Sequence, residues 1–416
     1  MTARMTIAAA AAATALAAAP APAQEEPLRI GLLLPFTGQY AWVGENVQPV
    51  ARMVAEEVNG SGGIGGREIA FVQGDTEGVV DAGTTAAQKL INVDNAMALV
   101  GPTSLSFSGS KNLIIDGGVP MVTPTAGTTE LDRACRDVCF RTVPSDSLGG
   151  RAIARAATDV AYLAEGAQAW ERPVLMVAQS PAMVSFLEPI ERSFADYGVE
   201  LAEVIEFTPN KPAYRSEVRE AMAADPDGIV LVAAPEDSAR VMTNAFQTGY
   251  QGGWFVTQDQ TNADYIDLAG AQTVEGIYGL EEVAAEESAA LNRAFEERYR
   301  EFAGEDVKIF GTNTYDSMNV LALAMLRDHR EDGEITRASL AGNIRAVSDP
   351  GEGKTVVSNY TDGKAALEAG EEIDYRGLVG PIDFDDWGNI AAPFGIRQVQ
   401  DGAWETVATV PASALD

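Results

Sequence analysis

Apolar runs alternate with amphipathic stretches along the first third of the chain. Leu28–Leu34 is an almost continuous apolar run, which predicts a strand buried on both faces of a parallel sheet. The pattern then predicts a helix over 45–58, a strand over 68–73, a helix over 81–92 and a strand from Met97 to Val100. This alternation of strand and helix predicts a doubly wound parallel α/β sheet.

The same alternation starts again in the middle of the chain. Apolar runs predict strands over 174–178, 200–207, 228–233 and 254–257, with helices over 183–197, 216–224 and 237–248 between them. A strand over 277–282 and helices over 288–302, 312–328 and 337–347 follow. The tail, 380–410, predicts short strands with turns, including a hairpin. Two halves result, and each is long enough to have its own core.

Two turns between Met97 and Leu131 are rich in hydroxyl groups. The first follows the strand that ends at Val100 and contains Thr103 and Ser104, and the second follows the apolar run 119–122 and contains Thr125 and Thr128. In a parallel sheet both turns lie at the carboxyl edge, where ligands bind. Backbone N–H groups at helix starts there favour an anion such as a carboxylate. The stretch therefore predicts a small-molecule site, without deciding between binding and catalysis.

The N-terminus and the charge indicate a compartment. Residues 1–23 contain one arginine, an Ala-rich apolar run and Ala-Pro-Ala, which predicts a secretory signal cleaved after Ala23 and a periplasmic protein. The alternative is a membrane anchor, for which the run is short. With 29 basic against 61 acidic residues, the net charge of −32 disfavours nucleic acid as a partner.

The two cysteines, Cys135 and Cys139, are separated by three residues. In an oxidising compartment they form a small-loop disulfide, and the alternatives are free thiols or a metal pair. A zinc site would need further ligands, and the only histidine is His329, in a charged segment. We therefore expect the disulfide, no metal and no cofactor.

Motifs of the common catalytic chemistries are absent from the sequence. There is no nucleophile elbow, Walker loop or HExxH motif, and a Ser-His-Asp site would have His329 as its single base. Residues 60–65 match G-x-G-x-x-G, but they follow a helix and precede a strand, the reverse of a dinucleotide site. We therefore expect no enzymatic activity.

Several motifs in order resemble one family. They are IGLLLPFTGQYAWVG, NGSGGIGGREI, VGPTS, GVPMVTPTAGTTEL, FRTVPSD, NTYDSMNVLALA and GPIDFDDWGNI. On these motifs, which span nearly all of the mature chain, the protein resembles the periplasmic solute-binding proteins of branched-chain amino-acid ABC transporters, the leucine/isoleucine/valine-binding type.

The resemblance implies the type I periplasmic binding protein fold. Two doubly wound, Rossmann-like lobes are joined by crossover strands and close around the solute by a hinge motion. It places lobe 1 at 28–143 plus 279–355 and lobe 2 at 144–278 plus 378–414. The implied partners are a small amino acid or related carboxylate and a membrane permease, and the protein is expected to be a monomer.

By position, the resemblance also implies the ligand contacts. Ser104 and the second-turn residues would hold the ligand carboxylate, and Asp259 would pair with its ammonium group, because both charged ends of a desolvated zwitterion need partners. The aromatic wall would come from Tyr40, Trp42 and Phe310. The second-turn residues are Thr125, Ala126, Gly127 and Thr128.

Each contact has a plainer alternative, and the opposing lobe departs from the family. Ser104 and Thr128 are also good helix N-caps, Asp259 a good turn residue and Phe310 a good core residue. The segments 179–184 and 234–237 lack the tyrosine or other aromatic residue that the family often has there, which leaves the solute open. The alternative function is a ligand-sensing regulator of the same fold, an amide or amino-acid sensor.

Overall fold

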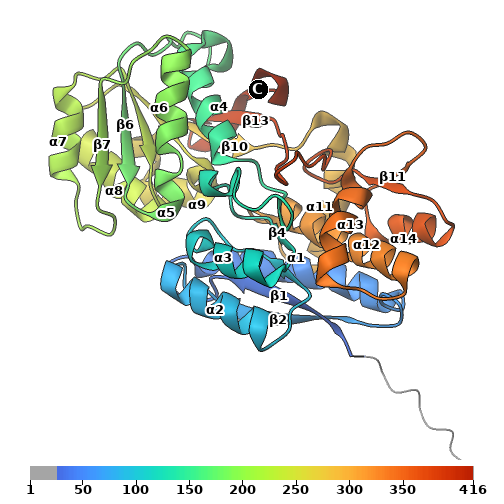
Figure 1. Ribbon diagram of the computed structural model, residues 1–416. Coiled ribbons are helices and arrows are strands. Elements are labelled where there is room, and N and C mark those ends of the chain that lie inside the picture. Colours follow the sequence, from blue (N-terminus) through green and yellow to red (C-terminus); the bar gives the residue numbers. More distant parts are fainter. Residues whose placement is uncertain (1–25, 416) are drawn as a thin grey trace, which may run out of the picture.

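The first sheet is built from the N-terminal third of the chain. The computed structural model describes residues 26–415, so the expected signal segment lies outside the described residues (Figure 1). Five parallel strands form the sheet in the order β2-β1-β3-β4-β5. Their bounds are β1 Leu28–Leu34, β2 Ile69–Asp75, β3 Ala98–Val100, β4 Met121–Thr123 and β5 Cys139–Arg141.

The second sheet repeats this order. Strands β7-β6-β8-β9-β10 run parallel, and the hairpin β13–β14 extends the β10 edge in antiparallel fashion. Both lobes therefore have the 2-1-3-4-5 order of a doubly wound sheet, and the predicted fold class is confirmed. The bounds are β6 Pro173–Ala178, β7 Glu203–Phe207, β8 Gly228–Val232, β9 Gly253–Val256, β10 Tyr278–Glu282, β13 Phe394–Gln400 and β14 Ala403–Val410.

Helices connect and cover the strands of both sheets (Figure 1). The first sheet carries α1 Ala41–Gly60, α2 Val80–Asn92 and α3 Phe107–Gly117. The second carries α4 Asp146–Thr158, α5 Pro181–Val184, α6 Leu187–Asp196, α7 Arg215–Ala223, α8 Pro235–Phe246, α9 Ala263–Ala269 and α10 Ala271–Val274. The chain then continues through α11 Ala289–Ala303, α12 Gly311–Asp332, α13 Arg337–Ser348 and α14 Tyr360–Glu368. None of the helices within residues 26–415 combines the length and the apolar character that crossing a membrane requires.

Two hydrophobic cores show how the chain passes between the lobes. One core joins β1 and α1 to α12, and it extends through Tyr375 to Ile390. The other runs from Ala152 to Leu280 and takes up Phe394 to Leu415. From these cores we propose lobe 1 as 26–143 plus 283–392 and lobe 2 as 144–282 plus 393–415. Relative to the predicted bounds, β10 moves to lobe 2, residues 378–392 move to lobe 1, and the previously unassigned residues 356–377 join lobe 1.

Several elements differ from the sequence prediction. The helix over 183–197 is split into α5 and α6, and at the break the hydroxyl of Ser185 donates to the carboxylate of Asp146. The prediction missed β11 (Thr355–Val357), α14 and β12 (Ile373–Tyr375). Residues 380–384 form no strand but follow a loop that is fixed by Asp316, whose carboxylate accepts the N–H groups of Leu378 and Val379 at 2.9 Å each.

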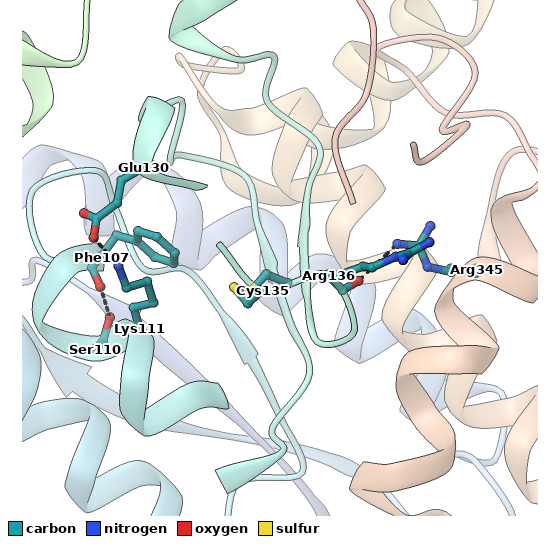
Figure 2. The surroundings of a disulfide bond; sticks show 8 residues. Phe107, Ser110, Lys111, Glu130, Cys135, Arg136 and Arg345 are labelled. Carbon is teal, nitrogen blue, oxygen red and sulfur yellow. Dashed lines mark hydrogen bonds and ion pairs between the residues drawn. A yellow bond between two sulfur atoms is a disulfide. The ribbon is translucent and has the colours of Figure 1, made fainter. Parts of the chain in front are cut away.

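The predicted disulfide between Cys135 and Cys139 is present (Figure 2). Both cysteines are buried in a small core with Phe107 and Leu131, between the second hydroxyl-rich turn and β5. The N–H of Cys139 also donates to the carbonyl of Cys135 at 3.1 Å. The disulfide thus holds the entrance to β5, which leads directly to the site described next.

Candidate functional site

A cavity lies where the carboxyl ends of the two sheets face each other. It encloses about 610 Å³ between the two lobes, its open mouth included. Loops that follow β1, β3, β4, β5, β6 and β9 form its wall, as expected for a doubly wound sheet, where ligands bind beyond the carboxyl ends of the strands. The lining residues are Tyr40, Trp42, Val43, Thr103, Ser104, Leu105, Thr125, Gly127, Val143, Asp146, Ala182, Met183, Phe186, Thr257, Gln258, Asp259 and Phe310.

The first-lobe side of the cavity is made of the two hydroxyl-rich turns, which are bonded to each other. The hydroxyl of Ser104 accepts the N–H of Thr128 at 3.1 Å, so its own proton remains available to a ligand. Behind them, Thr123 donates to the carbonyl of Pro102 at 2.7 Å and accepts the N–H groups of Thr125 and Ala126. The turns are thus fixed before any ligand arrives.

A buried arginine supports the second turn from behind. Arg141, fully buried at the end of β5, donates Nη1–H to the carbonyls of Gly127 at 3.0 Å and Thr128 at 3.2 Å. Its Nη2 pairs with Asp132, which also accepts the hydroxyls of Ser145 and Ser147 at 2.7 Å each. The arginine therefore fixes the turn through carbonyl groups and does not itself line the cavity.

Asp146 fills the space in front of Gly127. A Cβ atom on Gly127 would lie 2.2 Å from Oδ1 of Asp146, so only glycine allows the carboxyl group to sit there. Asp146 begins α4, is 5% exposed and is bonded to the hydroxyl of Ser185. Burial raises the pKa of Asp146 to about 7, and the nearby guanidinium of Arg141 only partly offsets this.

Asp259 lies across the cavity in the turn that follows β9. No side-chain hydrogen bond or ion pair to its carboxylate exists within residues 26–415, and its side chain keeps a surface toward the cavity. Burial alone raises its pKa to about 6. A cationic partner stabilises an unpaired carboxylate in a desolvated cavity, and the contact of Asp259 with an ammonium group, which the resemblance implies, stays a prediction.

Aromatic side chains form the wall between these polar ends. The rings of Trp42, in the first turn of α1, and Phe310, just before α12, are stacked with centroids 6.1 Å apart and an interplanar angle of 9°. Phe310 is therefore a wall residue rather than part of the buried core. Tyr40 lies next to them and lines the same cavity.

The second lobe presents apolar side chains where the family often has a tyrosine. Met183 and Phe186, around the break between α5 and α6, are both buried and line the cavity. The segment 234–237 does not line it. The second lobe therefore contributes apolar surface at Met183 and Phe186, and its polar lining residues are Asp146, Thr257, Gln258 and Asp259.

Seven of the nine ligand-contact residues expected from the sequence line the cavity. Ala126 and Thr128 do not, and the N–H groups of both residues are used within the two turns. Their direct contact with a ligand stays a prediction. The sequence reasoning missed Asp146, Met183 and Phe186. Asp146 stood in a helix-start signal, where a carboxylate is ordinary, so nothing local marked it as a site residue.

The described residues that line this cavity do not form a metal site. Among residues 26–415 no cluster of three or more histidine, cysteine or acidic side chains has the geometry for a metal ion. His329 lies in the last turn of α12, and it is not among the residues that line the cavity.

Comparison with known proteins agrees with this architecture. A family model described as periplasmic binding protein matches residues 27–403. The substrate-binding protein BasB of a chemotactic signal transduction system in Halobacterium salinarum is 23% identical over 92% of this chain and 89% of its own. The leucine-binding protein LivK from Thermotoga maritima superimposes with a TM-score of 0.75 at 22% identity, over 92% of this chain and 99% of its own. A solute-binding protein of an ABC transporter from R. palustris, in complex with benzoate, superimposes with a TM-score of 0.74 at 19% identity, over 92% of this chain and 97% of its own.

Proposed function

Because this chain belongs to the family of periplasmic binding proteins, we propose that it is the solute-binding component of an ABC importer and delivers a small amino-acid-like solute to a membrane permease. The family consists of solute-binding proteins, which supports a binding role rather than an enzymatic one. Two of the relatives named above are described as a leucine-binding protein and as a solute-binding protein in complex with benzoate, and both solutes are small carboxylates.

One observation carries the proposal. The cavity between the two lobes joins fixed hydrogen-bond donors on one side to the unpaired carboxylate of Asp259 on the other, with stacked aromatic rings between them. Such a cavity can desolvate and hold a small polar solute from both ends. Lobe closure would then present a changed surface to the permease.

The location and the assembly follow from the same proposal. We infer that residues 1–23 are removed on secretion and that the mature protein acts in the periplasm as a monomer. The alternative, a ligand-sensing regulator, is not favoured, because a secreted chain does not reach a cytoplasmic target.

Binding assays on the ligand-stripped protein test the function. The protein is unfolded in guanidinium chloride with its disulfide intact, dialysed, refolded and screened by thermal shift against amino acids, amides and aromatic acids. A solute at 100 times its Kd stabilises the fold by about 2.7 kcal/mol, which raises the melting temperature. If no solute of the screen raises it, the proposal fails.

The role of Asp259 is tested separately. Asp259→Ala should weaken binding of any amine-bearing hit by about ten- to a hundredfold, because a charge-assisted hydrogen bond of about 1.5–3 kcal/mol is lost. The matched control is Asp267→Asn, an exposed carboxylate on α9 of the same lobe. Unchanged affinity of the Asp259→Ala variant in calorimetry would show that this carboxylate is not the ammonium partner.

A further inference from the structure

The cavity is lined by negative charge without a positive counterpart. Its described lining residues include the carboxyl groups of Asp146 and Asp259, and none is lysine, arginine or histidine. A third carboxyl group, Glu282 at the end of β10, lies close enough to interact with both. Burial raises its pKa to about 8, so a cationic solute nearby would favour its charged form. The only hydrogen bond to its side chain within the described chain comes from Asn313, at 3.3 Å.

The nearest buried cation is already committed elsewhere. The guanidinium of Arg141 pairs directly with Asp132 and with two backbone carbonyls, so it only partly offsets the charge of Asp146. The cavity therefore keeps an uncompensated negative potential, which favours a solute of the opposite charge.

We propose that the solute has a net positive charge, as an organic amine whose charge is not balanced by its own carboxylate, and that Asp146 is a second specificity-determining residue beside Asp259. This inference rests on the proposed function and deepens it. It differs from the zwitterion that the sequence suggests, in which Asp259 alone meets the ammonium group.

The position of Asp146 disfavours a carboxylate at the second turn. The free donors there are the hydroxyl of Ser104 and the N–H of Gly127, for which the described residues offer no partner. An anion bound to Gly127 would lie beside Oδ1 of Asp146, which is 2.2 Å from where the Cβ of an alanine would be. Two carboxylates next to the same residue repel each other unless one takes up a proton. A neutral hydroxyl or amide oxygen meets the same donors without that repulsion.

A second polar group points to a ligand with a neutral acceptor or donor. Thr103 lines the cavity and is only 4% exposed, yet its hydroxyl has no hydrogen-bond partner among the described residues. Such a buried hydroxyl costs free energy unless a ligand satisfies it. The stacked rings of Trp42 and Phe310 add a surface that attracts an organic cation.

Matched trios of probes separate the three charge types. Leucinol, leucine and 4-methylpentanoate share one branched side chain, and phenylalaninol, phenylalanine and 3-phenylpropanoate share an aromatic one. Each is titrated by calorimetry into the ligand-stripped protein at pH 7 and low salt. In the trio whose side chain fits, we expect the amino alcohol to bind about tenfold more tightly than the amino acid or better, which corresponds to one charge-assisted contact, and no binding of the carboxylic acid.

A substitution then tests the role of Asp146 itself. Asp146→Asn should weaken binding of the amino alcohol and strengthen binding of the amino acid, because the repulsion of a ligand carboxylate is removed. If Asp146 had a merely structural role, its replacement would weaken binding of both the amino alcohol and the amino acid. Asp267→Asn, on the surface of the same lobe, should change neither.

The outcomes distinguish this inference from the proposed function. If the amino acid or the carboxylic acid of a trio binds more tightly than the amino alcohol of that trio, the inference is overturned and the solute-binding function still stands. Failure of both amino alcohols to bind overturns it as well. Failure of every solute in the wider screen overturns both.

Discussion

Replacement of Arg141 by methionine tests how the second turn is held in place. Methionine keeps an apolar, unbranched side chain of similar length but removes the guanidinium. Three acceptors then lose one donor each, namely the carbonyls of Gly127 and Thr128 and the carboxylate of Asp132. The two carbonyls keep the N–H groups of Asp146 and Leu131, respectively. One of the two carbonyls belongs to Thr128, which is more than nine-tenths buried, and the other belongs to Gly127, which forms part of the cavity wall.

The structure limits the size of the effect. Removal of one partner of a buried ion pair costs about 3–5 kcal/mol, because the remaining charge stays desolvated. The side chain of Asp132 is 28% exposed and keeps the hydroxyl donors of Ser145 and Ser147, so the value should lie at the lower end. We expect Arg141→Met to lower the free energy of unfolding by about 3 kcal/mol.

A surface pair on the same segment supplies the control. Arg136 pairs with Asp386 at 2.9 Å, but the two side chains are 56% and 79% exposed. Arg136→Met should therefore cost about 0–1 kcal/mol. Both variants are compared by urea unfolding of the ligand-free protein, followed by far-UV circular dichroism. A loss for Arg141→Met that is no larger than that for Arg136→Met would refute the reasoning.

Three further predictions concern packing, pH and the disulfide. Gly127→Ala should cost about 1–3 kcal/mol of stability in urea unfolding, because the added Cβ would meet the carboxyl group of Asp146 at 2.2 Å. The control Gly342→Ala, on α13 with open space around it, should be neutral or stabilising, and equal effects of the two substitutions would contradict the packing argument. Burial raises the pKa of Asp316 to about 7, so the folded state holds a proton that the unfolded chain releases near pH 4, and this contribution to stability is lost as pH rises from about 4 to 7. Between pH 5.5 and 8 the melting temperature of Asp316→Asn should therefore fall less steeply with pH than that of the wild type. Melting temperatures that fall in parallel would contradict the assignment. Replacement of both cysteines by alanine should cost about 2 kcal/mol, the chain-entropy value for so short a loop, while added reductant should destabilise only the wild type; no difference in unfolding between the two proteins would contradict a stabilising role.

The two-lobe fold could be predicted because its signals are local. Strands buried on both faces need continuous apolar runs such as Leu28–Leu34, and the turns after them need residues that cap helices and satisfy backbone groups. The spacing of Cys135 and Cys139 likewise restricted the pairing to a short loop, and the disulfide is confirmed. The strands β11 and β12 were missed, because a three-residue strand carries almost no periodic signal.

The cavity depends on tertiary contacts rather than on local sequence signals. The sequence by itself determined that two hydroxyl-rich turns would lie at a sheet edge and that Asp259 would follow a strand of the second lobe. Only the tertiary structure placed Asp146 against Gly127, Phe310 against Trp42, and Met183 and Phe186 across from them. These contacts join residues that are far apart in the chain, or that look like ordinary helix-start or core residues. Their chemistry depends on desolvation between the two lobes, which no local pattern of residues specifies.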